Sequence, residues 1–348
     1  MRALAHVVAH GARTALGPDV TSTALLLRTG VTAIGAAPLD DGEGAPVTMA
    51  FDPTLEPYAV GAERMAALAR AAAADLNAKL PAGAIRAMRV RVLLALPEVR
   101  LSQTRRERNL LISKELAPVL REAFGDADVD GDARGSAAPG YALPAALAAL
   151  ARRDIDAVVV GGVHSDYDPY EIASLRAEGR LFAPESIDAV LPGEAAAFAL
   201  LGRSDLDDRL GVPTSVVLAG VGSETSELTP DGGASAFDAS TLTGVFREAA
   251  RELPSELRIG WGLGDHGLEH YRIRELYAAI TRAHGLFGEP IAIDSPAQRL
   301  GRTGAASLPL SLALAAEAYL RGHAPSPIGV LFAGSDGGER AALVVRSP

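Results

Sequence analysis

The sequence predicts an α/β protein made from a duplicated unit, and three features support this fold class. Short apolar runs alternate with Ala/Leu-rich segments of helical period, which is typical of strands covered by helices on both faces. The segments 139–165 and 306–336 have the same order of small-residue helix and buried strand ending in Gly-Gly or Ala-Gly. Each is followed by a returning strand that opens with Gly-Glu, at 193–204 and 338–348.

The elements follow from runs of apolar residues and the Gly-rich or Pro-rich segments between them. The predicted strands are 5–9, 46–51, 90–96, 157–163, 195–201, 215–220, 257–261, 291–294, 329–333 and 341–345. Helices are predicted near 20–29, 62–79, 103–123, 139–152, 240–252, 270–284 and 304–321. The helices of the repeat are Ala-rich because a helix buried between two sheets must be thin. Loops are predicted at 38–46 and at 220–235, the second also separating the two halves.

The composition excludes several classes of function. With no cysteine in 348 residues, the chain has no disulfide, no thiolate nucleophile and no cysteine-based metal site. The formal charge of -10 argues against nucleic acid or an anionic membrane as a partner. No segment reaches the ~18 apolar residues of a membrane span, and the N-terminus is predicted to be a strand, not a signal peptide. We therefore expect a cytoplasmic protein without a metal or cofactor.

Five segments in the same order resemble the thiolase superfamily and, within it, the β-ketoacyl synthases (3-oxoacyl-ACP synthases). They are DAVVVGGVHS (156–165), RL (180–181), PGEAAAFALL (192–201), LGRTGAAS (300–307) and VLFAGSDGG (330–338). The resemblance implies the five-layered α/β/α/β/α thiolase fold. We place the N-terminal half at 1–212, with the nucleophile-position helix at 136–152, and the C-terminal half at 213–348.

The residues expected to carry the chemistry of this family are altered. Counting back from the Gly-Gly strand places Ser136 where the family has its nucleophilic cysteine. A hydroxyl needs an adjacent general base, and an N-cap role for Ser136 is the more ordinary alternative. The resemblance also implies two histidines from the second half. The first would correspond to His266 or His270, and arginine, which cannot act as a base, occupies the position of the second at Arg302.

Other residues of the expected site follow from the same segments. The family's lysine is missing near Ala297, and Phe332 is aligned with the gatekeeper phenylalanine. Arg302 is either an anion anchor or an ion-pair partner of Glu194 or Asp336, and His164 is predicted to be packed. The expected pocket comprises Arg302, Thr303, Phe332, Gly334 and Ser335.

A narrower resemblance is to the synthase-like accessory proteins of type VI secretion clusters. In these, an Asn-Gly-Glu-x-Tyr-Arg pattern replaces the family's His-Gly-Thr turn, and Gly267, Tyr271 and Arg272 fall at this place. The resemblance implies an accessory or adaptor role.

Two further motifs overlap this segment. Residues 262–267 match G-x-G-x-x-G, which would bind a nucleotide if a helix followed at once. Residues 266–270 match H-x-x-E-H, which would bind zinc only if both histidines shared a helix face. A Gly-rich turn and a polar loop are the simpler interpretations.

Three functions follow as hypotheses. The first is a non-condensing, homodimeric scaffold, adaptor or accessory subunit, possible partners being a secretion effector or an acyl carrier protein. In the family, strands near the nucleophile helix pair across a two-fold axis. The second is a Ser136-dependent acyltransferase or synthase acting on acyl-CoA or acyl carrier protein, with His266 or His270 as base. The third is a partner of an active ketosynthase, analogous to a chain length factor.

Overall fold

The computed structural model describes residues 3–99, 103–227 and 239–348. In the first half, the strands are β1 (Ala5–Thr14), β2 (Ile34–Asp40), β3 (Pro46–Ala50), β4 (Val90–Ala95), β5 (Asp128–Asp132), β6 (Ala157–Ser165) and β7 (Glu194–Gly202). The helices there are α1 (Val20–Arg28), α2 (Gly61–Asn77), α3 (Gln103–Phe124), α4 (Ala138–Ala151), α5 (Pro169–Ala177) and α6 (Leu206–Leu210).

The second half contains β8 (Val216–Thr225), β9 (Ile259–Gly264), β10 (Phe287–Asp294), β11 (Ile328–Gly334) and β12 (Glu339–Arg346). Its helices are α7 (Ser240–Ala249), α8 (His270–Arg282), α9 (Ala297–Leu300) and α10 (Ser307–Leu320). Short 3-10 turns at Gly135–Ala137 and Gly304–Ala306 lead into α4 and α10.

Strand order reveals the duplication. One half has the order β5-β4-β6-β7-β1 and the other has β10-β9-β11-β12-β8, with the same parallel and antiparallel pairings. The two halves join where β1 pairs antiparallel with β8, over Ala5–Val7 and Val216–Leu218. The returning strands β7 and β12 begin at Glu194 and Glu339, as the repeated Gly-Glu pattern predicts.

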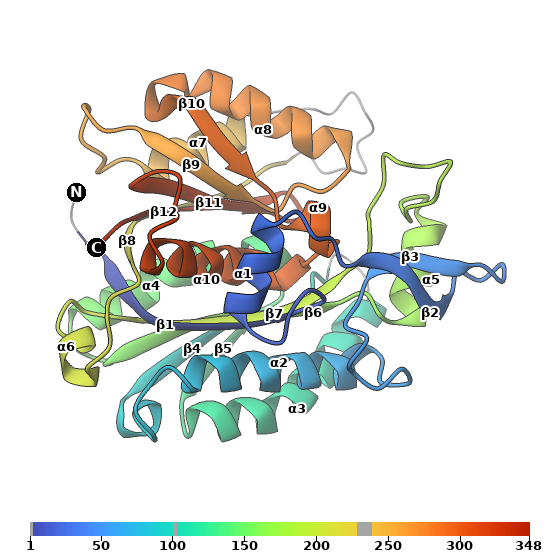
Figure 1. Ribbon diagram of the computed structural model, residues 1–348, viewed down its shortest axis with the longest axis horizontal. Coiled ribbons are helices and arrows are strands. Elements are labelled where there is room, and N and C mark those ends of the chain that lie inside the picture. Colours follow the sequence, from blue (N-terminus) through green and yellow to red (C-terminus); the bar gives the residue numbers. More distant parts are fainter. Residues whose placement is uncertain (1–2, 100–102, 228–238) are drawn as a thin grey trace.

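The elements form five layers (Figure 1). Helices α7 and α8 cover one sheet, α4 and α10 lie between the sheets, and α2 and α3 cover the other sheet. Three apolar clusters fill the interfaces between these layers. Both central helices have 14 residues, and every residue of α10 from Ser307 to Ala318 is buried. The predicted α/β/α/β/α thiolase fold is therefore confirmed.

The sequence-based prediction differs from the structure at several elements. It omits β2, β5, α5, α6 and α9. The strand β5 has no apolar pattern because its sequence, DVDGD, lies largely exposed at a sheet edge. The loop predicted at 38–46 begins inside β2. The loop predicted at 220–235 begins inside β8, and its residues from 228 lie outside the described part. Gly220 belongs to β8, where it pairs with Val344 of β12, and it is glycine because a Cβ there would lie 1.8 Å from the carbonyl oxygen of Ala249 in α7.

Two properties of the described residues bear on function. No helix there has both the length and the apolar character needed to cross a membrane. In the same residues, no three His, Asp or Glu side chains are grouped so that they could hold a metal ion.

Candidate functional site

A polar cavity of about 90 Å³ lies where the two central helices begin. The turns before α4 and α10 form one side of it. The segments that follow β4, β9 and β11, the end of β6, residues of α2, α3, α5 and α8, and the segment 180–191 form the rest. Four of the residues predicted for the site line this cavity together with Ser136, namely Arg302, Thr303, Gly334 and Ser335. The structure thus brings together the start of α4 and segments from both halves of the chain.

Ser136 lies in the turn Gly135–Ala137 and is half-buried. Its predicted N-cap role is wrong, because the N-cap of α4 is Ala137 and no side chain of that segment caps the helix. Instead, the hydroxyl of Ser335 accepts a hydrogen bond from the backbone N–H of Ala137 at 3.1 Å. A residue of the second half therefore satisfies the helix start that Ser136 was expected to cap.

Arg302 is bound to Asp166, not to Glu194 or Asp336 as its sequence context suggested. Its Nε lies 3.0 Å from Oδ2 of Asp166, and a second guanidinium nitrogen donates to Oδ1. Asp166 is completely buried and also accepts from Nε2 of His164 at 3.0 Å. Burial alone would raise the pKa of Asp166, but Arg302 and His164 together hold it well below its ordinary value. The pair is thus ionised at neutral pH, and Arg302 is a fixed cation.

A second cluster surrounds Asp336. Arg180 lies 2.8 Å from one oxygen of this carboxylate, while Arg272 and the hydroxyl of Tyr271 bond the other oxygen at 2.9 and 3.1 Å. Arg180 also bonds Glu269 at 2.8 Å. Tyr271 and Arg272, singled out by the narrower sequence resemblance, therefore belong to the wall of the cavity through Asp336.

Backbone donors beside the cavity already have an anionic partner. The carboxylate of Glu98 accepts from the N–H of Asp336 at 3.0 Å and from the N–H of Gly337. The N–H of Gly334 donates to the carboxylate of Asp265 at 3.0 Å. The N–H of Ser335 donates to the backbone carbonyl oxygen of Glu339 at 2.8 Å. Because these backbone N–H groups already donate hydrogen bonds within the protein, they are not available to stabilise an oxyanion.

The two histidines proposed as bases lie elsewhere. His270 is the first residue of α8, has 67% of its side chain exposed and pairs with Asp188 at 3.2 Å. His266 is buried and stacks on Phe332, with ring centroids 6.1 Å apart. Burial lowers the pKa of His266, so its imidazole is neutral at pH 7. Neither histidine lines the cavity of Ser136, and Phe332 lines a separate small cavity with His266.

The histidine that does line the cavity is His164, which the sequence predicted only as packed. It is buried, and its Nδ1 has no hydrogen-bond partner among the described residues. This nitrogen faces Gly304, where a Cβ would lie 2.3 Å away. His164 is therefore both packed and the one imidazole beside Ser136 in the described cavity lining.

Neither overlapping motif has the geometry its chemistry needs. Residues 265–269 form a loop between β9 and α8, so the two histidines of H-x-x-E-H do not share a helix. The G-x-G-x-x-G match ends at Gly267, and α8 begins only at His270. The zinc and nucleotide interpretations are therefore wrong.

Close backbone contacts fix the position of Arg302. A Cβ on Gly193 would lie 2.3 Å from the carbonyl oxygen of Leu300, and the N–H of Arg302 bonds the carbonyl oxygen of Leu191 at 2.7 Å. The Gly-Glu pattern at the start of β7 thus has a physical reason, which is the approach of two backbones.

We predict that Gly193→Ala lowers the free energy of unfolding by ~1–3 kcal/mol, because its Cβ meets backbone that must move. Gly285→Ala is the matched control, since nothing lies within 4 Å of a Cβ there. Urea unfolding of both variants measures the difference. Equal stability of the two variants would show that the segments of Gly193 and Leu300 can separate at no cost.

The comparisons with known proteins agree with the fold. No protein-family model matches the sequence. No curated protein matches it either. Among solved structures, an oxazolomycin ketosynthase domain (KS7) of Streptomyces albus JA3453 is 16% identical, with a TM-score of 0.77, 99% of this chain covered and 75% of that chain covered.

Two further solved structures match this chain over nearly the whole length of both chains. One is a type II polyketide ketosynthase in complex with its acyl carrier protein, at 14% identity and TM-score 0.81, with 99% of each chain covered. The other is the ishigamide ketosynthase/chain length factor, at 15% identity and TM-score 0.76, again with 99% of each chain covered. The chain therefore has the fold of ketosynthases and chain length factors.

Proposed function

We propose that this protein is a non-condensing subunit of ketosynthase fold, which assembles with a partner subunit in the manner of a chain length factor. The observation that carries the proposal is the network of arginines and carboxylates that surrounds the cavity at Ser136. Asp166 fixes Arg302 at the position where the sequence resemblance implies a catalytic histidine. Near the turn of Ser136, the carboxylate of Glu98 and the backbone carbonyl oxygen of Glu339 accept hydrogen bonds from backbone N–H groups.

The network leaves little of the chemistry that condensation needs. A serine at the helix start needs a base, and an arginine held by a buried carboxylate remains protonated. Burial would lower the pKa of Arg302, but Asp166 more than offsets this and raises it. Arg302 therefore contributes a permanent positive charge and no proton transfer.

The surface that would receive a partner is the open edge of β5. This strand ends the ten-stranded order, and on its other side it pairs with β4. Val129 of β5 is 44% exposed, and Leu110 and Leu111 of α3, the helix whose Ser113 and Ala117 line one hollow with Val129, are 72% and 58% exposed. An open strand edge beside exposed apolar side chains is a template for pairing with another chain.

The identity of the partner follows from the proposed role. Two of the similar solved structures are described as a ketosynthase with its acyl carrier protein and as a ketosynthase/chain length factor. We infer a ketosynthase-fold partner. The alternative from the sequence, an adaptor for a secretion effector, predicts instead that an effector protein copurifies with this chain.

A second candidate function, a Ser136-dependent acyltransferase, is favoured by one observation, which is that Ser136 and His164 line the same cavity. His164 could act as a base only through Nδ1, because its Nε2 is bonded to Asp166. This possibility and the proposed function give opposite results in one experiment.

We predict that the protein forms no covalent adduct with acetyl-CoA, malonyl-CoA or octanoyl-loaded acyl carrier protein. Intact-mass measurement after incubation at pH 7.5 tests this, with an active ketosynthase as positive control. An acyl adduct that is lost in both Ser136→Ala and His164→Ala would overturn the proposal and establish the acyltransferase. An adduct that persists in both variants would mark acylation elsewhere on the surface and leave the proposed role of the cavity intact.

A further inference from the structure

A second cleft, separate from the cavity of Ser136, opens beside the other central helix. It has a volume of about 270 Å³ and lies between α1, β9, β10, α9 and α10. None of its lining residues belongs to the Ser136 cavity. We call it the Trp261 cleft, and it is lined by Ala24, Leu27, Arg28, Trp261, Leu263, Ile293, Asp294, Ser295, Pro296, Gln298, Arg299, Leu314, Ala318, His323 and Pro325.

The floor of the Trp261 cleft is apolar and rigid. Trp261 packs edge-on against Tyr319 with ring centroids 5.9 Å apart. The indole N–H donates to Oδ2 of Asp294 at 3.0 Å, which fixes the orientation of the ring. Leu263 and Leu314 belong to the central apolar cluster of the protein, so the floor is continuous with the core. Such a surface suits the apolar body of a ligand.

Two arginines at this cleft differ from the arginines of the Ser136 cavity. Across residues 3–99, 103–227 and 239–348, no carboxylate lies within ion-pair distance of Arg28 or Arg299. By contrast, Arg180, Arg272 and Arg302 each bind a carboxylate. A guanidinium without a carboxylate, beside an apolar floor, is able to bind an incoming anion.

The backbone around Arg299 is fixed before any ligand arrives. Its carbonyl oxygen accepts from the N–H of Ala33 at 3.0 Å and from the hydroxyl of Thr32 at 3.3 Å. A Cβ on Gly30 would lie 3.1 Å from its Nη1, so the guanidinium lies against the turn that follows α1. The segment that follows Arg28, the last residue of α1, is thereby attached to α9. Preorganised cations lose less entropy on binding an anion.

The charged side chains that line the cleft have a net positive charge. Asp294 is the one carboxylate among the lining residues, against Arg28 and Arg299. Burial lowers the pKa of His323, and Arg28 lowers it further, so this ring is neutral at pH 7. In a chain with a net charge of -10, this is a local site for an anion.

We propose that the Trp261 cleft binds a small amphipathic carboxylate, whose apolar body packs on Trp261 and Leu263 while its carboxylate pairs with Arg28 and Arg299. The volume lies just below the roughly 300–1,000 Å³ of common ligand pockets, so the ligand is compact. The neighbouring carboxylate of Asp294 disfavours a more highly charged anion. This site does not depend on the chemistry of Ser136 or on assembly with a partner.

Trp261 makes the proposal directly measurable, because it is the single tryptophan of the chain. Titration of the full-length protein with octanoate should change the tryptophan fluorescence saturably, with half-saturation at or below about 1 mM. The uncharged counterpart, 1-octanol, should bind at least ~10-fold more weakly, because it lacks the charge-assisted hydrogen bonds. Octanoate should also raise the melting temperature of the protein.

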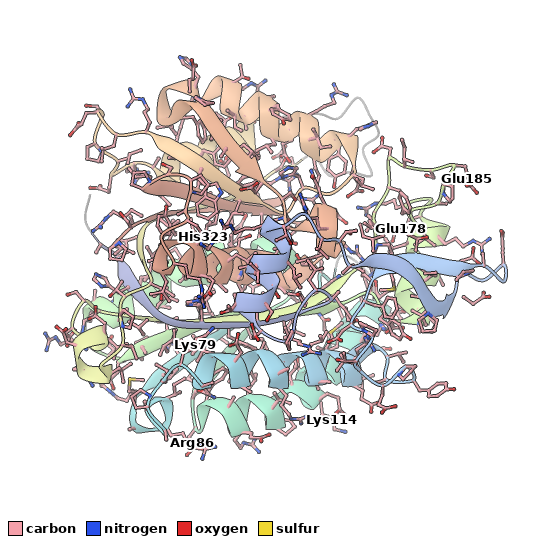
Figure 2. The ribbon with its side chains drawn as sticks, viewed as in Figure 1. Lys79, Arg86, Lys114, Glu178, Glu185 and His323 are labelled. Carbon is pink, nitrogen blue, oxygen red and sulfur yellow. The ribbon has the colours of Figure 1, made fainter. Side chains whose placement is uncertain are left out.

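The charge variants separate anion recognition from general apolar binding. Arg28→Gln/Arg299→Gln should weaken octanoate binding at least ~10-fold and leave 1-octanol binding unchanged. The matched control is Arg106→Gln/Lys114→Gln, which removes two exposed positive charges from α3 and should change neither. Figure 2 shows Lys114 on the outer layer formed by α3, well away from His323 beside the central helix. Equal melting temperatures without ligand confirm that all variants are folded.

Three outcomes would overturn the proposal. They are no saturable fluorescence change up to about 10 mM octanoate, equal affinity for 1-octanol, and unchanged octanoate affinity in Arg28→Gln/Arg299→Gln. Each leaves the proposed function untouched, since that rests on the cavity of Ser136 and on β5.

Discussion

Arg302→Met should lower the free energy of unfolding at pH 7 by roughly 3–5 kcal/mol, the cost of removing one partner from a buried ion pair. Asp166 is completely buried, so without Arg302 it would keep only His164 and the N–H of Gly193 as donors. Methionine fills a similar volume but carries no charge. Urea unfolding followed by circular dichroism measures the loss.

The cost of this substitution should depend on pH in a defined direction. In the wild type, the folded pKa of Asp166 is depressed, because Arg302 and His164 outweigh the effect of burial. Its stabilising contribution is therefore complete above the unfolded pKa of about 3.9 and is lost as the pH falls through the folded value. In Arg302→Met, the main group that opposes the effect of burial on the pKa of Asp166 is absent, so burial raises this pKa. The stability difference between wild type and variant should thus be largest near neutral pH and shrink as the pH falls through the raised pKa of Asp166 in the variant and on toward its depressed pKa in the wild type.

The control is Arg152→Met, which breaks the exposed pair of Arg152 and Asp154. This change should cost no more than ~1 kcal/mol, because exposed ion pairs contribute little. If Arg302→Met costs as little as Arg152→Met, the ion pair is not the main support of the cavity wall, and the central observation behind the proposed function fails.

The fold could be predicted from the sequence because its signal is repeated and local. Each half carries its own Ala-rich helix, buried strand and Gly-Glu opening, so the same pattern could be detected twice. Edge strands do not carry this signal. The first four residues of β5, whose sequence is DVDGD, are exposed, and no apolar alternation could identify the strand.

The candidate site was predictable only in part, for a different reason. The position of Ser136 followed from counting along one helix and strand, which the fold keeps rigid. The partners of Arg302 and Arg180 did not follow, because Asp166 and Asp336 lie 136 and 156 residues away in the chain. Contacts at such separation depend on how the two halves pack. The one local signal for Asp166 was its place next to the predicted Gly-Gly strand.

Self-association of this chain through β5 should be weak, although the fold resemblance predicted a homodimer. A two-fold axis would pair β5 with a second β5 in the antiparallel sense. In a register centred on Asp130, Asp130 would lie opposite its own copy and Asp128 opposite Asp132, and like charges directly opposite each other are destabilising. The charge of this edge therefore favours a partner with basic residues on its own edge strand.

Charge reversal at this edge should create a dimer where neither chain forms one alone. Asp130 is exposed and has no ion pair among the described residues, so Asp130→Lys is expected to fold. At about 10 µM, wild type and variant should each be monomeric, while their 1:1 mixture should form a heterodimer stabilised by a Lys–Asp pair across β5. Mass photometry or sedimentation velocity, with one chain tagged to change its mass, measures this.

The exposed leucines of α3, Leu110 and Leu111, provide a second test of this association. In the mixture, Leu110→Ser/Leu111→Ser on one chain should weaken the heterodimer at least ~10-fold, if these exposed leucines of α3 are buried on association. Salt should weaken the heterodimer as well, because its specificity comes from surface charge. A wild-type homodimer that survives both the lysine and the serine substitutions would place the interface elsewhere on the molecule. A mixture that remains monomeric at 10 µM would show that the edge of β5 does not pair by charge, and the proposed route of assembly would then be wrong.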